Sequence, residues 1–282
     1  MMKNPLKENS ILASQRYNRE MNSHLIEIIS FLYGICVGSF LNVCICRIPI
    51  GKSIIFPGSA CMACQNPVKF YDNLPILSYI LLKGKCRTCK APFSIRYPLT
   101  EFLTGLSALF VYYKFGLSLD ALLYFIFIAM LIVITFIDID HQIIPDVISL
   151  PGIPIGVLFA ALSRNQEIWG ALIESLIGIL AGGGSLYLVA LTYKTVTGKD
   201  GMGGGDIKLL AMIGALIGWK GVLFTIFAGS AIGTLLGIGG MLYSKNMNMK
   251  LAIPFGPFLS MGAVIYIFFG PSIINWYFSR LI

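Results

Sequence analysis

The stretch LLYFIFIAMLIVITFIDIDHQIIPD, residues 122–146, decides how the rest of the chain is interpreted. Its first part, residues 122–137, contains no charged residue, no glycine and no proline, which favours a helix near the length that crosses a bilayer. Asp138 and Asp140 follow this part directly, and Asp146 ends the stretch. The sequence therefore predicts a membrane helix whose end presents a row of carboxylates at one membrane face.

The composition extends this prediction to the whole chain. Of the 282 residues, 56% are hydrophobic and only 12% are charged, whereas a soluble protein carries about 25% charged residues. The mean hydropathy is +0.80. We therefore expect an all-α polytopic membrane protein with about eight transmembrane helices, at residues 24–46, 99–114, 118–137, 147–163, 169–192, 206–219, 221–243 and 255–275.

The chain divides by composition into four parts. Residues 1–23 form a polar N-terminal tail, and residues 24–46 form the first transmembrane helix. Because no short apolar segment with a small-residue cleavage site precedes it, we interpret this helix as an anchor and not as a removable signal. Residues 47–98 form a loop domain, and residues 99–282 form the remaining transmembrane core.

The net charge of +8 raises the question of what the basic residues face. Between Arg47 and Arg96 there are eight basic residues and one acid, Asp72. This excess predicts that the loop is cytoplasmic, although the basic residues of the N-terminal tail favour the opposite orientation. A basic face on anionic lipid explains the charge better than nucleic-acid binding does, so we expect the lipid bilayer and no nucleic acid as a partner.

Four cysteines in the loop have the spacing of a metal site. Cys61 and Cys64 form one C-x-x-C pair, Cys86 and Cys89 form a second, and 21 residues separate the pairs. Two such knuckles complete a tetrahedral site of four sulfurs, which favours zinc. Two disulfides or a redox pair are the alternatives, but a cytoplasmic loop is reduced. We therefore expect a structural zinc that stabilises a loop with few apolar runs.

A second acidic position stands in the segment GMGGGDIKLL, residues 201–210. Asp206 opens an apolar segment, where a carboxylate in the first turn suits the helix dipole and can act as a cap. A cap does not require Gly203, Gly204 and Gly205, which let backbone or substrate approach the acid closely. Gly201 extends this stretch.

A pair of aspartates can share one proton, so that one acts as general base toward water and the other as general acid. Asp206 and the acids of the DID segment, Asp138 and Asp140, are the candidates, since all fall on the predicted side of the zinc loop. An aspartic hydrolase is one hypothesis. A transporter or sensor that uses the two acids as a proton or cation relay, with the knuckles as a regulatory head, is another.

Other catalytic patterns find no match. His141 lies beside Asp140, but the only other histidine is His24, which excludes a histidine-rich metal site. The sequence has no G-x-S-x-G, no H-E-x-x-H and no Walker loop. The glycines before Asp206 lack the preceding strand and the G-K-[ST] ending of a nucleotide loop.

Taken in order, these segments resemble the type IV prepilin leader peptidase and N-methyltransferase family of pilus, competence and type II secretion systems. The resemblance covers about residues 34–260. It comprises GSFLNVCICRIP, the two C-x-x-C pairs, NLPILSY between them, RYPLTE after them, DIDHQIIPD, TGKDGMGGGDIKLLAMIGA and IPFGP.

The resemblance implies an intramembrane aspartic peptidase with a G-x-G-D motif, here the glycines that precede Asp206. Asp138, the first acid of DID, would then be its catalytic partner, and the four cysteines would bind zinc. The implied substrates are prepilins or pseudopilins with a short basic leader, cleaved at the cytoplasmic face of the inner membrane. S-adenosylmethionine would donate a methyl group to the new N-terminal amine, with the zinc loop near KGKC as the place for its binding. A peptidase of the same chemistry that acts on other membrane signal sequences is an alternative.

Overall fold

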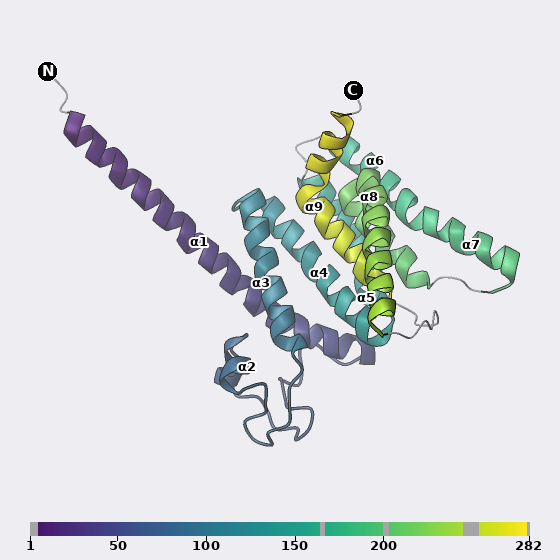
Figure 1. Ribbon diagram of the computed structural model, residues 1–282, viewed down its shortest axis with the longest axis horizontal. Coiled ribbons are helices and arrows are strands. Elements are labelled where there is room, and N and C mark those ends of the chain that lie inside the picture. The colour runs from purple at the N-terminus through teal and green to yellow at the C-terminus, as the bar shows by residue number, and fades with distance from the viewer. Residues whose placement is uncertain (1–4, 164–166, 200–202, 245–253, 281–282) are drawn as a thin grey trace. The chain divides into compact units, whose positions relative to one another are not determined.

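The computed structural model describes residues 5–163, 167–199, 203–244 and 254–280 (Figure 1). Within these ranges the chain forms helices and turns, with isolated bridges and no strand, which confirms the all-α prediction. The helices are α1 Pro5–Arg47, η1 Ile48–Ile50, η2 Phe70–Asn73, α2 Leu77–Leu81, α3 Arg96–Phe115, α4 Leu119–His141, α5 Asp146–Ser163, α6 Ile168–Ile179, the π-helical η3 Leu180–Gly184, α7 Ser185–Thr197, α8 Gly204–Ser244 and α9 Gly256–Phe278.

Apolar length confirms a multi-pass membrane protein. In the described part of the chain, five segments are long and apolar enough to cross a membrane: Ser23–Ile50, Leu119–His141, Ile168–Thr197, Gly204–Gly240 and Gly256–Tyr277. A shorter apolar helix covers Asp146–Leu162. Seven of the eight predicted apolar segments lie within a single helix, to within one residue at their ends, and two of these seven share α8. The remaining segment, 169–192, runs across α6, η3 and α7.

The chain forms two compact units. The first contains the residues up to Asn42 together with Pro57–Ala121, and the second contains Val43–Phe56 together with the chain from Leu122 onward. The four cysteines fall in the first unit, and Asp138 and Asp206 fall in the second.

Small residues let α1 and α3 approach closely in the first unit. A Cβ atom added at Gly38 would lie 2.6 Å from the Cα of Glu101, and one added at Gly34 would lie 2.7 Å from the Cβ of Ala108. The space beside Gly105 of α3 is likewise filled by Ile35 and Phe31 of α1. Small residues are the usual means by which membrane helices pack backbone to backbone.

A buried carboxylate ties the loop to this helix pair. Glu101 is 7% exposed, and its Oε2 accepts a hydrogen bond of 2.7 Å from the backbone N–H of Ile76. Ile76 has φ 59° and ψ −49°, a strained conformation for a β-branched residue, and the Leu77 N–H bonds across it to the carbonyl of Pro75. The carboxylate therefore stabilises a tight turn between the two C-x-x-C pairs.

The second unit is built around α8. In the apolar 18-residue stretch of α8, 72% of the residues are buried, against 44% in that of α9. The helix α8 packs against α5, α6, η3 and α9. Figure 1 shows α9 beside α8, and shows α6, η3 and α7 as one long rod. Gly178 of α6 and Gly214 of α8 each lie against the carbonyl oxygen of the other, so this crossing has no room for a side chain.

The helix α8 does not run straight. Gly218 has φ 73° and ψ 177°, a conformation essentially restricted to glycine. A Cβ at Gly214 would lie 2.9 Å from a methyl group of Val222, although eight residues of straight helix span about 12 Å. The chain therefore folds back at Gly218, and α8 forms two apolar segments that pack on each other.

Candidate active site and metal centre

The two C-x-x-C pairs form matching turns. Cys61 N–H donates to the Asn66 carbonyl at 3.0 Å, and Cys86 N–H donates to the Ala91 carbonyl at 2.8 Å. The residue after each second cysteine has positive φ, 57° at Gln65 and 60° at Lys90, and an isolated bridge closes each turn. Every one of these contacts repeats 25 positions later, as Cys61 corresponds to Cys86 and Cys64 to Cys89.

The four sulfurs meet in one cluster. All four Sγ atoms lie within 4.8 Å of one another, and those of Cys61 and Cys89 are 3.8 Å apart. Tetrahedral zinc with Zn–S bonds of about 2.3 Å places its sulfurs about 3.8 Å apart. The cluster therefore has the geometry of a four-thiolate metal site, which leaves no ligand position for water.

Backbone donors favour the thiolate at the first cysteine of each pair. The N–H groups of Cys89 and Thr88 lower the pKa of the Cys86 thiol to about 6. Those of Cys64 and Ala63 lower the pKa of Cys61 in the same way. Each turn thus favours, at its first cysteine, the thiolate form that binds a cation.

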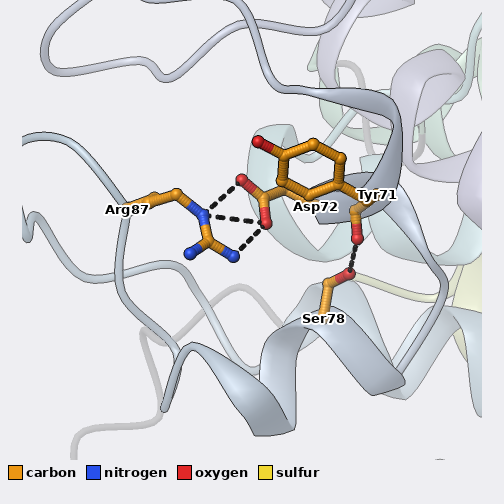
Figure 2. A network of polar contacts seen from close by, with 4 residues as sticks. All are labelled: Tyr71, Asp72, Ser78 and Arg87. Carbon is orange, nitrogen blue, oxygen red and sulfur yellow. Dashed lines mark hydrogen bonds and ion pairs between the residues drawn. The ribbon is translucent and has the colours of Figure 1, made fainter.

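An ion pair braces the second turn against η2. Arg87 donates to both carboxylate oxygens of Asp72, from Nη2 at 2.6 Å and from Nε at 2.8 and 3.1 Å, and this guanidinium lowers the pKa of Asp72 (Figure 2). The Arg87 guanidinium also lies 5.6 Å from the ring centroid of Tyr71. The Ser78 hydroxyl donates to the Tyr71 carbonyl at 3.1 Å, so α2 joins the same network.

Asp138 lies in the last turn of α4 and is 5% exposed. Its Oδ2 accepts a hydrogen bond of 3.1 Å from the backbone N–H of Gly256, the first residue of α9. A buried carboxylate at the end of a membrane helix is costly, so it marks a candidate functional group.

Asp206 lies in the first turn of α8, and its carboxyl group interacts electrostatically with that of Asp138. The fold therefore brings together the two acids that the sequence singled out, although 67 residues lie between them. Such an interaction disfavours ionisation of both carboxyl groups at once, so the two acids can titrate as a pair.

The glycines before Asp206 have different surroundings. A Cβ at Gly203 or Gly204 would meet no atom within 4 Å, whereas one at Gly205 would lie 2.9 Å from the Cβ of Ile144. Gly205 is thus required by packing, and the other two leave open space beside the acid. Gly201 lies outside the described residues.

An ion pair lies close to these two acids in the sequence. Lys208 Nζ donates to Asp146 Oδ1 at 2.7 Å and so links the start of α5 to the first turn of α8. Neither Lys208 nor Gly256 received a role from the sequence. Lys208 follows Asp206 by two positions, and Gly256 lies in the motif IPFGP. The sequence thus drew attention to both segments but did not identify the residues that Lys208 and Gly256 contact.

Comparison with protein families matches two consecutive parts of the chain. Residues 32–115 match the Bacterial Peptidase A24 N-terminal domain, and residues 125–238 match the Type IV leader peptidase family. No solved structure matches the chain.

Three relatives illustrate how far the similarity extends. The prepilin leader peptidase/N-methyltransferase of Aeromonas hydrophila is 34% identical, over 89% of this chain and 93% of the relative. Those of Pseudomonas aeruginosa and Neisseria gonorrhoeae are each 35% identical, over 89% of this chain and 92% and 94% of the relatives. The two matched parts contain the four cysteines and the two aspartates, and the chain belongs to the type IV leader peptidase family.

Proposed function

We propose that this protein is a membrane aspartic endopeptidase that removes the leader peptide of type IV prepilins or pseudopilins. The observation that supports the proposal is that the carboxyl groups of Asp138 and Asp206, which come from distant segments of the chain, interact electrostatically. The names of the relatives favour this hydrolase over the transporter considered from the sequence.

The reaction needs no metal and no covalent intermediate. One carboxylate takes a proton from water, and the water oxygen bonds to the scissile carbonyl carbon while the other carboxyl group protonates the carbonyl oxygen. When the tetrahedral intermediate collapses, the C–N bond breaks and the proton held by the base passes to the leaving nitrogen. The carboxyl group that gave its proton recovers it from the hydroxyl, so the pair ends with its one proton.

The open space at Gly203 and Gly204 suits an extended substrate backbone beside Asp206. The apolar helix of the substrate would remain in lipid, with its leader at the cytoplasmic face. We place the zinc loop and both aspartates toward the cytoplasm, in agreement with the excess of basic residues between Arg47 and Arg96.

The metal that we propose for Cys61, Cys64, Cys86 and Cys89 is a structural zinc. The sulfur spacing fits this ion, and four thiolates fill its coordination sphere. Zinc would thus fix the two turns to each other and would not activate water.

Methylation of the freed amine is the second proposed reaction, with S-adenosylmethionine as the donor of an electrophilic methyl group. Near the KGKC segment, a Cβ at Gly84 would lie 2.9 Å from the Tyr79 hydroxyl oxygen, so this side of the turn is filled by the tyrosine. We assign the donor no binding residue.

Two substitutions test the peptidase. Asp138→Asn and Asp206→Asn should each lower leader removal by at least about 10⁴-fold, because each removes one half of a unit that acts together. The measurement is the mass of the prepilin N-terminus after incubation with membranes that contain equal amounts of each variant. A wild type that leaves the leader in place, or a variant that removes it normally, would contradict the proposal.

A further inference from the structure

The start of α9 contacts one of the two catalytic acids. This segment, PFGP at residues 254–257, brings the Gly256 N–H to Asp138 Oδ2 at 3.1 Å in a buried hydrogen bond. The described residues provide Asp206 with no corresponding donor, so the two carboxyl groups have different surroundings.

Position 256 has no room for a side chain. A Cβ atom there would lie 2.6 Å from Asp138 Oδ2, closer than real Cβ contacts come, and 3.3 Å from the Cδ1 of Ile144. Gly256 does not have positive φ, so its backbone conformation is open to other residues. A side chain at this position would therefore displace the Asp138 carboxylate from the Gly256 amide.

Helix dipoles explain why Asp138 needs this donor. The carboxylate lies in the last turn of α4, where the partial negative charge of the helix end disfavours an anion. The first turn of α9 presents N–H groups and a partial positive charge to the same carboxylate. A hydrogen bond to the charged form of a carboxyl group stabilises that form.

We propose that Gly256 is a positioning residue, whose amide holds Asp138 as the ionised carboxylate that takes the proton from water. Asp206 is then the member that starts protonated and protonates the scissile carbonyl oxygen. The bond to Gly256 uses Oδ2 of Asp138 and leaves Oδ1 to accept the proton. This inference rests on the proposed peptidase function and assigns the two roles within it.

The test compares Gly256→Ala with a matched control on the same helix, Gly262→Ala. A Cβ at Gly262 would lie 2.7 Å from the Thr225 carbonyl oxygen, a backbone atom that yields less readily than a side chain. The control therefore disturbs packing at least as much, but only Gly256→Ala touches Asp138. Steady-state cleavage of a prepilin is measured for both, with thermal unfolding in detergent as the measure of packing.

We expect Gly256→Ala to lower kcat about 10²-fold, as the loss of one oriented donor does elsewhere, with KM within about twofold. Gly262→Ala should keep kcat within about threefold of the wild type, although its unfolding temperature falls at least as far as that of Gly256→Ala. If the wild type cleaves the prepilin and the two variants have equal kcat values, the inference is overturned. Cleavage by neither the wild type nor the control would instead refute the proposed function.

A second variant serves if Gly256→Ala does not fold. Replacing Gly256 by glycolic acid through nonsense suppression exchanges the N–H for an ester oxygen and adds no atom. We expect at least a tenfold loss of kcat with KM unchanged. An ester variant with wild-type kcat would overturn the role of the amide.

Discussion

At the scale of single residues, the thiols of Cys86 and Cys89 have different pKa values although they belong to the same turn. Two backbone N–H groups lower the pKa of Cys86 to about 6. At Cys89 the N–H of Ala91 also lowers the pKa, but desolvation and the neighbouring sulfurs outweigh it and raise the pKa to about 11. At neutral pH the first sulfur is therefore mostly anionic, and the second must lose a proton before it can bind a metal.

This difference predicts how zinc binding depends on pH. Because the ligand is the thiolate, the apparent affinity should rise about tenfold per pH unit for each proton released, and at least one is released between pH 6 and pH 8. Competition with a coloured chelator over this range measures the slope. Cys86→Ser should lose the site, whereas Cys36→Ser, in the exposed part of α1, should keep it. An affinity that does not change with pH would contradict the assignment of these ligands.

At the scale of elements, the close crossing of α6 and α8 depends on glycine. Gly214→Ala should destabilise the second unit by about 1–3 kcal/mol, because its Cβ would meet the Gly178 carbonyl oxygen in a contact that cannot relax through a side chain. Unfolding in a series of detergent mixtures measures the loss. The matched change Gly184→Ala, at a helical glycine with no atom within 4 Å of an added Cβ, should cost almost nothing. Equal losses would show that the crossing is not tight.

Features that depend on residues close together in the sequence could be predicted from it. The two C-x-x-C pairs carry their ligands within single turns, so spacing alone predicted the cluster at Cys61, Cys64, Cys86 and Cys89. The role of Gly256 could not be predicted, because its partner Asp138 is far away in the sequence and the contact involves a backbone amide. Gly178 and Gly214 likewise have no local pattern that identifies one as the neighbour of the other.

At the scale of the whole molecule, the meeting of Asp138 and Asp206 constrains how the chain crosses the bilayer. Between them lie α5 and the rod of α6, η3 and α7. If the long rod crosses, α5 must cross too, or the two acids would end on opposite faces. The 18 residues of α5 span about 27 Å, slightly less than the hydrocarbon core of about 30 Å. The sequence predicted residues 147–163 as a transmembrane helix, although the length of α5 alone is weak evidence that it crosses the bilayer.

The distribution of basic residues predicts the orientation of the zinc loop. A fluorescent reporter inserted after Gly58, in the zinc loop, should fold in the cytoplasm, because basic loops remain on that side. Alkaline phosphatase inserted after Gly116, between α3 and α4, should be active only outside. A Cβ atom added at either glycine would meet no atom within 4 Å, so the insertions encounter little steric resistance. Reporters active on the same side would refute this orientation.

The turn at Gly218 has a consequence for the other end of the molecule. A straight α8 of 41 residues would extend about 60 Å, further than a bilayer of about 40–45 Å, and would carry its end beyond the far leaflet. The reversal instead returns the chain, so that α9 starts within reach of Asp138. A bulky residue at this one glycine would disfavour the reversal, and would thus act at a distance by drawing the Gly256 amide away from Asp138.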